Sequence, residues 1–219
     1  MLQLKNISFA YIKDNNIFEN INLSFEADKI YAIQGLSGSG KSTLLNIIAG
    51  LDNRYQGQLM YDNQEINHLN ITNYKKDDVS MIFQDQNLLH YLNILDNIKL
   101  ECLIKHKIID ETLLNKYLGQ FNLSNLNLKK YPRILSGGQQ QRITLIRSLL
   151  SGSKIILADE PTANVDEETA FNIINEFKYL AHQEHKIIII VTHNNQIASL
   201  CDVTYLLKDG LIMEKEHLK

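Results

Sequence analysis

The sequence predicts an α/β domain built around a parallel β-sheet. Residues 154–159 and 186–192 form apolar runs of the kind found in strands that are buried on both faces. Residues 167–184 follow a helical pattern between these runs, and a strand at residues 30–34 leads through a Gly-rich loop into another helical pattern. This alternation of strands and helices is typical of a parallel sheet covered by helices.

Four more strands are expected in the first third of the chain. Residues 2–9 and 17–25 are rich in Ile, Leu and Phe and predict two strands joined by a turn at residues 14–16. Residues 58–61 and 79–83 predict two others. We expect the N-terminal strands to form an antiparallel β subdomain beside the parallel sheet.

The middle and the end of the chain differ in pattern. Residues 93–122 alternate apolar and polar side chains with a helical period, so this part is predicted to be mainly helical. Residues 203–208 and 211–215 predict a closing hairpin around an Asp-Gly turn. We therefore predict one domain over residues 1–219, with a helical subdomain inserted at roughly residues 85–152.

Composition limits the possible functions. A chain of 219 residues with 44% hydrophobic content suits one sizeable core, and the net charge of -3 argues against a dedicated nucleic-acid binder. Cys102 and Cys201 form no Cys-x-x-Cys motif and no secretory leader is recognisable, which suits a reducing cytosol. Apolar runs such as residues 187–191 are far shorter than the roughly 20 residues of a membrane helix. Any membrane-spanning part should therefore belong to another protein.

The first chemical motif is the Gly-rich loop that follows the predicted strand at residues 30–34. This phosphate loop consists of Gly35, Leu36, Ser37, Gly38, Ser39, Gly40, Lys41, Ser42 and Thr43. Its glycines let successive backbone N–H groups face one phosphate chain, and the helix that begins at Lys41 adds its positive N-terminal end. We expect Lys41 to reach the β and γ phosphates and the Ser42 hydroxyl to bind Mg²⁺.

The same pattern also occurs by chance in ordinary surface turns. Its position between a predicted strand and a predicted helix argues against that alternative. By itself the motif predicts only nucleoside triphosphate binding, which GTPases, kinases and recombinases share. The fold class narrows to a P-loop NTPase, and the reaction stays open.

Two carboxylates end the predicted strand at residues 154–159. A parallel strand delivers its last residues to the ligand crevice at the carboxyl edge of the sheet. There Asp159 suits the shell of Mg²⁺, and Glu160 suits a base that orients or deprotonates an attacking water. In isolation the pair could equally be two solvated acids, but next to a phosphate loop they predict a hydrolase.

A second anion-binding element, the signature element, stands directly before a predicted helix at residues 140–150. It consists of Leu135, Ser136, Gly137, Gly138 and Gln139. A Ser-Gly-Gly helix start offers free backbone donors to an anion. With Asp159 and Glu160 just downstream, the sequence resembles the nucleotide-binding domains of ABC ATPases over essentially its whole length. The resemblance implies a RecA-like core, binding of ATP and Mg²⁺, and a head-to-tail homodimer in which the signature element contacts ATP held by the opposite chain.

Four further positions match the motifs of that family. Tyr11 matches the aromatic residue that stacks on adenine, and Gln84 matches the glutamine that touches Mg²⁺ or the water and senses the membrane partner. Asp166 lies in the loop that crosses the dimer interface, and His193 matches the histidine that holds the γ-phosphate. The resemblance thus implies a catalytic set of Glu160, His193 and Gln84.

Each of these positions also has a simpler interpretation. Tyr11 could belong to the core, and Gln84 could be an ordinary loop residue. Asp166 could cap the following helix, and a lone His such as His193 is usually structural. The resemblance, and not the pattern alone, favours the functional roles.

Within the family, residues 83–89 and 157–164 resemble the bacterial group that releases lipoproteins, exports macrolides or confers resistance to antimicrobial peptides. Proteins of that group work with separate membrane subunits. We therefore expect a permease partner, membrane contact only through it, and a cytoplasmic position at the inner face of the cell membrane. The sequence departs from the group at residues 90–91, where His-Tyr replaces Pro-Thr in the segment that would meet the permease, and at positions 163 and 165, where Ala and Val replace Gly and Leu.

The expected function is an ATPase that closes as a dimer on two Mg-ATP and drives a permease in export, extraction or resistance to peptide, lipid-like or drug substrates. The alternative is a regulatory ABC ATPase of the cell-division type, which transmits motion and moves no cargo. ABC-like DNA-repair ATPases form a third class, but they need a long coiled coil between the phosphate loop and the signature element. Residues 40–135 have room only for a small helical subdomain, so no nucleic-acid partner is expected.

Overall fold

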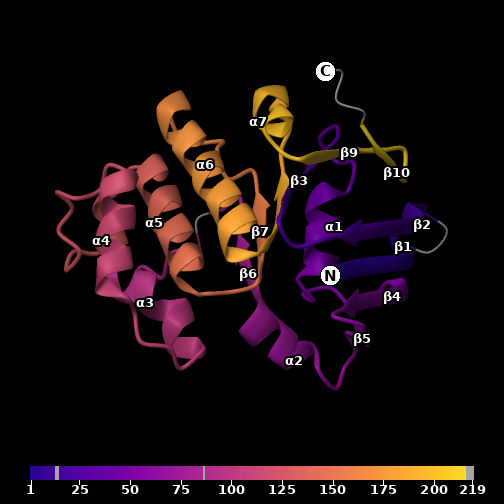
Figure 1. Cartoon of the computed structure of the whole chain (residues 1–219), viewed down its shortest axis with the longest axis horizontal. Coiled ribbons are helices and arrows are strands. Elements are labelled where there is room, and N and C mark those ends of the chain that lie inside the picture. The colour runs from indigo at the N-terminus through magenta and orange to yellow at the C-terminus, as the bar shows by residue number, and fades with distance from the viewer. Residues whose placement is uncertain (13–14, 86, 216–219) are drawn as a thin grey trace.

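The computed structural model describes residues 1–12, 15–85 and 87–215, which form two β-sheets and a set of helices (Figure 1). The larger sheet has six strands in the order β10-β9-β3-β8-β7-β6. Its strands are β3 (Lys29–Gln34), β6 (Val79–Ile82), β7 (Ile155–Asp159), β8 (Ile187–Val191), β9 (Val203–Lys208) and β10 (Leu211–Glu214). All neighbours pair in parallel except β9 and β10, which form the predicted closing hairpin. The predicted parallel sheet is confirmed.

The smaller sheet is antiparallel, in the order β2-β1-β4-β5. Its strands are β1 (Leu2–Ile12), β2 (Asn15–Phe25), β4 (Gln56–Tyr61) and β5 (Gln64–Glu65). The first two strands are longer than predicted, because Asn15 and Asn16 pair with β1 and do not form the expected turn. Asp14, the other residue of that predicted turn, lies outside the described residues.

The helices pack against both faces of the larger sheet. They are α1 (Lys41–Ile48), α2 (Ile71–Asn73) followed by a π-helical turn (Tyr74–Asp78), α3 (Ile94–Ile104), α4 (Glu111–Gln120), a 3-10 turn (Pro132–Ile134), α5 (Gly137–Leu150), α6 (Glu167–Glu184) and α7 (Asn195–Ser199). Figure 1 shows α3 to α6 on one side and α1 with the antiparallel sheet on the other. The region predicted as mainly helical at residues 93–122 is two helices, because α3 ends at Ile104 and Asp110 caps a new helix.

The core has two halves because successive side chains of a strand point to opposite faces. On β8, Ile188 and Ile190 pack with α3 to α6, whereas Ile187, Ile189 and Val191 pack with α1, β1 and β2. Helix α1 is therefore held between the two sheets. This packing fixes the start of α1, and with it the phosphate loop, against the edge of the parallel sheet.

Candidate active site

Several of the predicted functional residues follow strands that end at one edge of the larger sheet. Strands β3, β8, β7 and β6 are parallel neighbours, so their carboxyl ends lie side by side. The phosphate loop follows β3, and His193 follows β8 after one residue. Asp159 ends β7 with Glu160 next to it, and the exposed Gln84 comes two residues after β6. The topology therefore aligns all four elements along the crevice where ligands of such sheets bind.

The glycines of the phosphate loop are required by close approach and by backbone conformation. A Cβ atom at Gly35 would lie 2.5 Å from the carbonyl oxygen of Leu207, which belongs to the neighbouring strand β9. Gly40 has a φ of +97°, and a Cβ atom there would lie 2.7 Å from the ring of Phe18. Any side chain at either position would push the loop away from the sheet. The two glycines therefore let the loop lie close against β9 and β2.

Lys41 lies across the phosphate loop. Its ammonium donates hydrogen bonds to the carbonyl oxygens of Gly35 and Leu36, at 2.9 and 2.8 Å. The start of helix α1 behind it has no side-chain cap and no acidic residue in its first turn. A positive helix end that no side chain caps, with a lysine held over the same loop, is chemically suited to a polyphosphate.

Asp159 is a buried carboxylic acid beside the start of α1. Burial raises its pKa, and the neighbouring charge of Glu160 raises it further. The Ser42 hydroxyl and the Lys41 ammonium act in the opposite direction and lower the pKa. Asp159 and Ser42 thus bring two oxygen atoms together next to the phosphate loop. This pair of hard oxygen donors suits Mg²⁺, whose charge would offset the cost of burying the carboxylate.

Glu160 is held in an unusual backbone conformation. Its φ is +48°, a left-handed value that costs a non-glycine residue roughly 1–2 kcal/mol. The carboxylate lies 2.7 Å from His193 Nδ1 and accepts a hydrogen bond from the backbone N–H of His193 at 3.0 Å. The Thr192 hydroxyl donates to its other oxygen at 3.3 Å. The structure therefore joins the predicted base and the predicted histidine directly, with Glu160 largely buried and His193 mostly exposed.

Tyr11 lies on β1 beside the phosphate loop. Its hydroxyl is hydrogen-bonded to the hydroxyl of Thr43 at 2.8 Å, and Phe9 packs against its ring edge-to-face. The side chain is 56% exposed, so the interpretation of Tyr11 as a core residue is wrong. An exposed aromatic ring next to a phosphate loop is placed where a nucleotide base could stack on it.

The signature element begins α5, three residues earlier than predicted. Ser136 caps this helix, because its hydroxyl accepts from the N–H of Gln139, and the Gln139 side chain accepts from the N–H of Ser136 in return. This capping box explains why two glycines can start a helix. A Cβ atom at Gly137 would meet nothing within 4 Å, whereas one at Gly138 would lie 2.7 Å from the carbonyl oxygen of Asn164. The face at Gly137 is therefore open to a ligand or to another chain, and the preceding Leu135 is buried.

Asp166 performs the simpler of its two expected roles. It caps α6, and its carboxylate accepts hydrogen bonds from the backbone N–H and the hydroxyl of Thr169, both at 2.8 Å. These bonds lower its pKa. Its expected place in the loop that crosses the dimer interface, and with it a part in binding the nucleotide, remains a prediction.

One residue of the site could not be picked out from the sequence pattern. Gln141, on α5, is 2% exposed and bonds the backbone of both Glu160 and Asn164. The sequence offers one signal for it: Gln141 is a glutamine at a core-facing position of α5. A buried polar side chain needs hydrogen-bond partners, so such a residue is expected to bond a neighbouring element.

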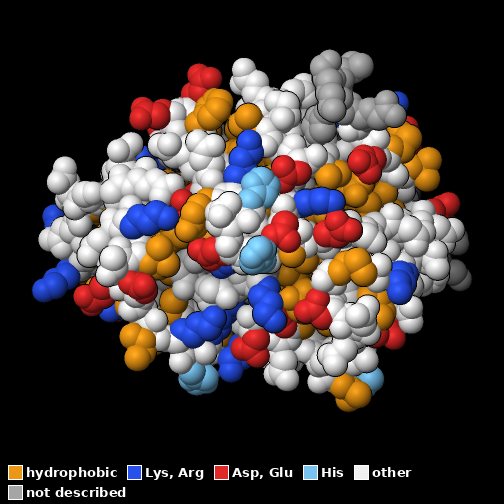
Figure 2. Space-filling model, viewed as in Figure 1, with side chains coloured by type: hydrophobic (Ala, Val, Ile, Leu, Met, Phe, Trp, Pro, Cys, Tyr) orange, Lys and Arg blue, Asp and Glu red, His pale blue; other side chains and the backbone are white. Residues whose placement is uncertain are grey.

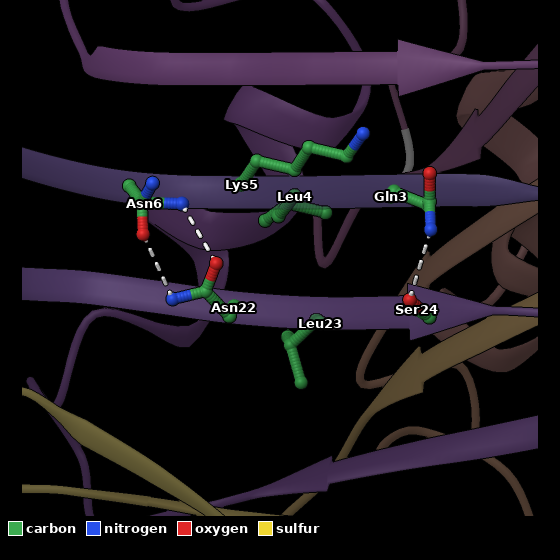
Figure 3. A pocket seen from close by; sticks show the side chains of 7 residues that line it. All are labelled: Gln3, Leu4, Lys5, Asn6, Asn22, Leu23 and Ser24. Carbon is green, nitrogen blue, oxygen red and sulfur yellow. Dashed lines mark hydrogen bonds between the residues drawn. The ribbon is translucent and has the colours of Figure 1, made fainter. Parts of the chain in front are cut away.

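A surface hollow opens beside Glu160 and His193. It is lined by Glu160, Thr162, Ala163, Val165, Glu167, Ala170, Phe171, His193, Asn194, Gln196, Ile197 and Leu200. A second hollow, shown in Figure 3, lies on the outer face of β1 and β2 and is lined by residues 3–6 and 22–24. There Asn6 pairs with Asn22, and Gln3 pairs with Ser24, so much of its polar lining is already satisfied. Of these two hollows, the one next to Glu160 is lined by two of the predicted catalytic residues, Glu160 and His193.

Comparisons with known proteins found a matching family and similar chains. Residues 18–163 match the model of the family described as ABC transporter. The chain is 37% identical to the lipoprotein-releasing system ATP-binding protein LolD of Rickettsia bellii, with 97% of each chain covered. It is also 37% identical to the macrolide export ATP-binding/permease protein MacB of Campylobacter jejuni, of which it covers 34%, with 97% of this chain aligned.

A solved structure shares the whole fold. The dimeric ATP-binding cassette MJ0796, in a post-hydrolysis state bound to ADP and Pi, superposes with a TM-score of 0.88 at 31% identity, and 100% of both chains is covered. The expected P-loop fold and the resemblance to the lipoprotein-releasing and macrolide-exporting group are confirmed.

Proposed function

Because this chain belongs to the ABC transporter family and is an ATP hydrolase of the ABC type, we propose that it powers a separate membrane permease by closing and opening as a homodimer around ATP. One observation carries this proposal: the phosphate loop, Asp159, Glu160 and His193 converge at the carboxyl ends of adjacent parallel strands. LolD and MacB, which are named for lipoprotein release and macrolide export, favour extraction or export of lipid-like, peptide or drug substrates.

The residues of the site divide the reaction between them. The N–H groups of the phosphate loop and the Lys41 ammonium hold the phosphates of ATP, and Ser42 with Asp159 would hold Mg²⁺. Bound Mg²⁺ supplies positive charge that stabilises the phosphoryl oxygens in the transition state. Glu160 accepts the proton of the attacking water, and His193, hydrogen-bonded to it, steadies the γ-phosphate and the carboxylate together. Gln84, exposed two residues after β6, would contact Mg²⁺ or the attacking water.

We propose that two chains are needed for one complete site. The contacts described for Gly138 and Gln139 run to Asn164 and to the first turn of α5, while the face at Gly137 stays open. That open face suits the γ-phosphate of ATP held by a second chain. MJ0796 forms a dimer with ADP and Pi, which supports such a head-to-tail arrangement here.

Replacing Tyr11 with Ala should weaken ATP binding by about 1–3 kcal/mol, because one base would lose its aromatic partner. Titration with ATP and with inorganic triphosphate measures this loss directly. Lys41→Ala is the matched control, since it should weaken both ligands by removing a phosphate contact. Equal weakening of both ligands in the Tyr11 variant would show that Tyr11 supports the loop and does not bind the base.

The membrane connection should be made by another protein. Within residues 1–12, 15–85 and 87–215, no helix is both long and apolar enough to cross a membrane. MacB carries the names ATP-binding and permease together, and this chain covers only 34% of it. LolD is named as the ATP-binding protein of a lipoprotein-releasing system and aligns over 97% of each chain; by analogy with it, we propose a permease on a separate chain and a peripheral position for this subunit at the cytoplasmic face of the membrane.

The proposed docking segment is residues 87–93, which follows Gln84. The buried side chain of Asn97 holds this segment by hydrogen bonds to the backbone of Leu89, Leu92 and Asn93. Tyr91 projects from it with 75% of its surface exposed. A rigid segment with an exposed aromatic residue is well suited to anchor a partner.

Tyr91→Asp should abolish stimulation of the ATPase by the permease and leave basal hydrolysis within about twofold, because a buried charge at a contact is costly. The measurement compares phosphate release with and without the membrane proteins encoded beside this gene, in proteoliposomes. Lys129→Asp, a charge reversal at an exposed site in the loop that bonds the start of α3, serves as the control. Normal stimulation of the Tyr91 variant would place the docking surface elsewhere.

A nucleic-acid partner is not supported. Figure 2 shows Lys and Arg interspersed with Asp and Glu over the visible face, and not gathered into a basic stripe. The net charge of -3 agrees with this distribution.

A further inference from the structure

We propose that Gln141 is a positioning residue for ATP hydrolysis. Its side chain joins the turn that contains Glu160 to α5, the helix that begins with the signature element. The inference rests on the proposed role of Glu160 as the base. It adds a residue that acts through the backbone of Glu160 and that need not touch ATP.

The side chain of Gln141 holds both ends of one short turn. Its Nε2 donates a hydrogen bond to the carbonyl oxygen of Glu160 at 3.1 Å, and its Oε1 accepts one from the backbone N–H of Asn164 at 3.2 Å. The side chain is almost completely buried, so water does not compete freely for these bonds. One amide group therefore bridges the first and last residues of the segment 160–164.

This bridge acts on a backbone that needs support. Glu160 adopts a left-handed φ of +48°, which persists only when surrounding contacts enforce it. On the side of the sheet, the N–H of Glu160 donates to the carbonyl oxygen of Val191 at 3.0 Å. Within the turn, the N–H of Ala163 donates to the carbonyl oxygen of Glu160 at 3.2 Å. On the side of α5, Gln141 donates the hydrogen bond to the carbonyl oxygen of Glu160. Because the backbone at Glu160 sets the direction of its side chain, Gln141 helps to aim the carboxylate at its place beside His193.

The same helix carries the signature element. Gly138 lies so close to Asn164 that a Cβ atom would come within 2.7 Å of its carbonyl oxygen, so the first turn of α5 packs directly against the turn 160–164. In the proposed dimer, the signature element of one chain contacts ATP whose hydrolysis depends on Glu160 of the other chain. Gln141 would then link contact between the signature element and the ATP of the opposite chain to the position of Glu160 in its own chain.

The main alternative is that Gln141 is only a satisfied core residue. Both interpretations predict some loss of stability when it is replaced, because two backbone groups would lose their partners. They differ in what else changes. A positioning residue should act through Glu160, whereas a core residue should affect the fold regardless of which side chain stands at position 160.

The first test is Gln141→Met, which keeps the length of the side chain and removes both hydrogen bonds. We expect kcat to fall by about 10- to 100-fold, the size of effect seen when a reacting group is displaced by about 1 Å, while ATP affinity in a fluorescence titration changes less than about twofold. Gln120→Met is the control. Gln120, on α4, donates a hydrogen bond to Glu176 on α6, so its replacement should leave kcat and ATP affinity unchanged. A kcat equal to that of the parent would overturn the proposal.

The second test is a double-mutant cycle with Glu160→Gln. If Gln141 acts through the base, Gln141→Met should lower the residual rate of the Glu160→Gln variant by less than about twofold, so the two effects do not add. An undiminished loss of about 10- to 100-fold in that background would show a purely structural role. Should the Met variant fail to fold, Gln141→Glu keeps the acceptor for Asn164 N–H, loses the donor to Glu160, and must show the same dependence. If Glu160→Gln alone hydrolyses at the parent rate, the proposed function has failed and this inference fails with it. A slow Glu160→Gln variant beside a Gln141→Met variant with the parent kcat would overturn this inference alone.

Discussion

Replacing Glu160 with Gln should slow ATP hydrolysis by about 10²- to 10⁴-fold and leave ATP binding intact. The amide keeps the shape of the side chain: its oxygen can replace one carboxylate oxygen and accept from the His193 N–H, and its NH2 group can replace the other and donate to the Thr192 hydroxyl. It cannot take a proton from water. The expected loss is therefore one of catalysis and not of structure.

Single-turnover phosphate release, with ATP affinity measured in parallel, separates these quantities. Glu167→Gln is a suitable control, because Glu167 is an exposed acid that lines the same hollow beside Glu160. It should hydrolyse ATP at the parent rate. A Glu160→Gln variant that also keeps the parent rate would remove Glu160 from the chemistry.

Ser136→Arg should abolish the ATP-dependent dimer while each chain still binds ATP. The change places a long cation at the start of α5, on the open face where we propose that the γ-phosphate of the opposite chain sits. It also removes the cap of α5, at a cost of about 0.5–2 kcal/mol, which a folded domain can tolerate. Ser136→Ala loses the same cap without adding bulk, so it separates the effect of the cap from that of the cation. Thermal unfolding and ATP titration of the three proteins provide the check.

The parallel sheet and the phosphate loop were predictable from the sequence for physical reasons. Strands β7 and β8 are buried on both faces, and a short, continuous apolar run is typical of such a strand. The phosphate loop needs glycines at fixed positions because Gly35 and Gly40 have no room for side chains. Constraints of this kind leave a clear trace in a single sequence.

Short or locally encoded elements were less predictable. Helix α7 has five residues, and β5 has two, so neither is long enough to repeat its pattern. The start of α5 was placed too late because glycine is a poor helix former, and the capping box formed by Ser136 and Gln139 outweighs that preference. The spacing of Ser136 and Gln139 is itself a sequence signal for a helix start, and the prediction gave more weight to the glycines.

The candidate site followed the same division. Residues at the ends of predicted strands, such as Asp159 and His193, could be placed because parallel strands bring their carboxyl ends together. Gln141 could not, since its role depends on the turn at residues 160–164 folding back onto α5. Contacts between a helix and a loop that is distant in sequence require the tertiary structure.

The two-chain site can be tested most directly by size-exclusion chromatography of the Glu160→Gln variant. Because this variant should bind ATP without hydrolysing it, we expect a dimer peak in Mg-ATP and a monomer peak in ADP. Adding Ser136→Arg to the same chain should return the protein to the monomer peak in Mg-ATP, although ATP still binds. A dimer that persists unchanged with Ser136→Arg would contradict the shared site and leave a P-loop ATPase whose chains act alone.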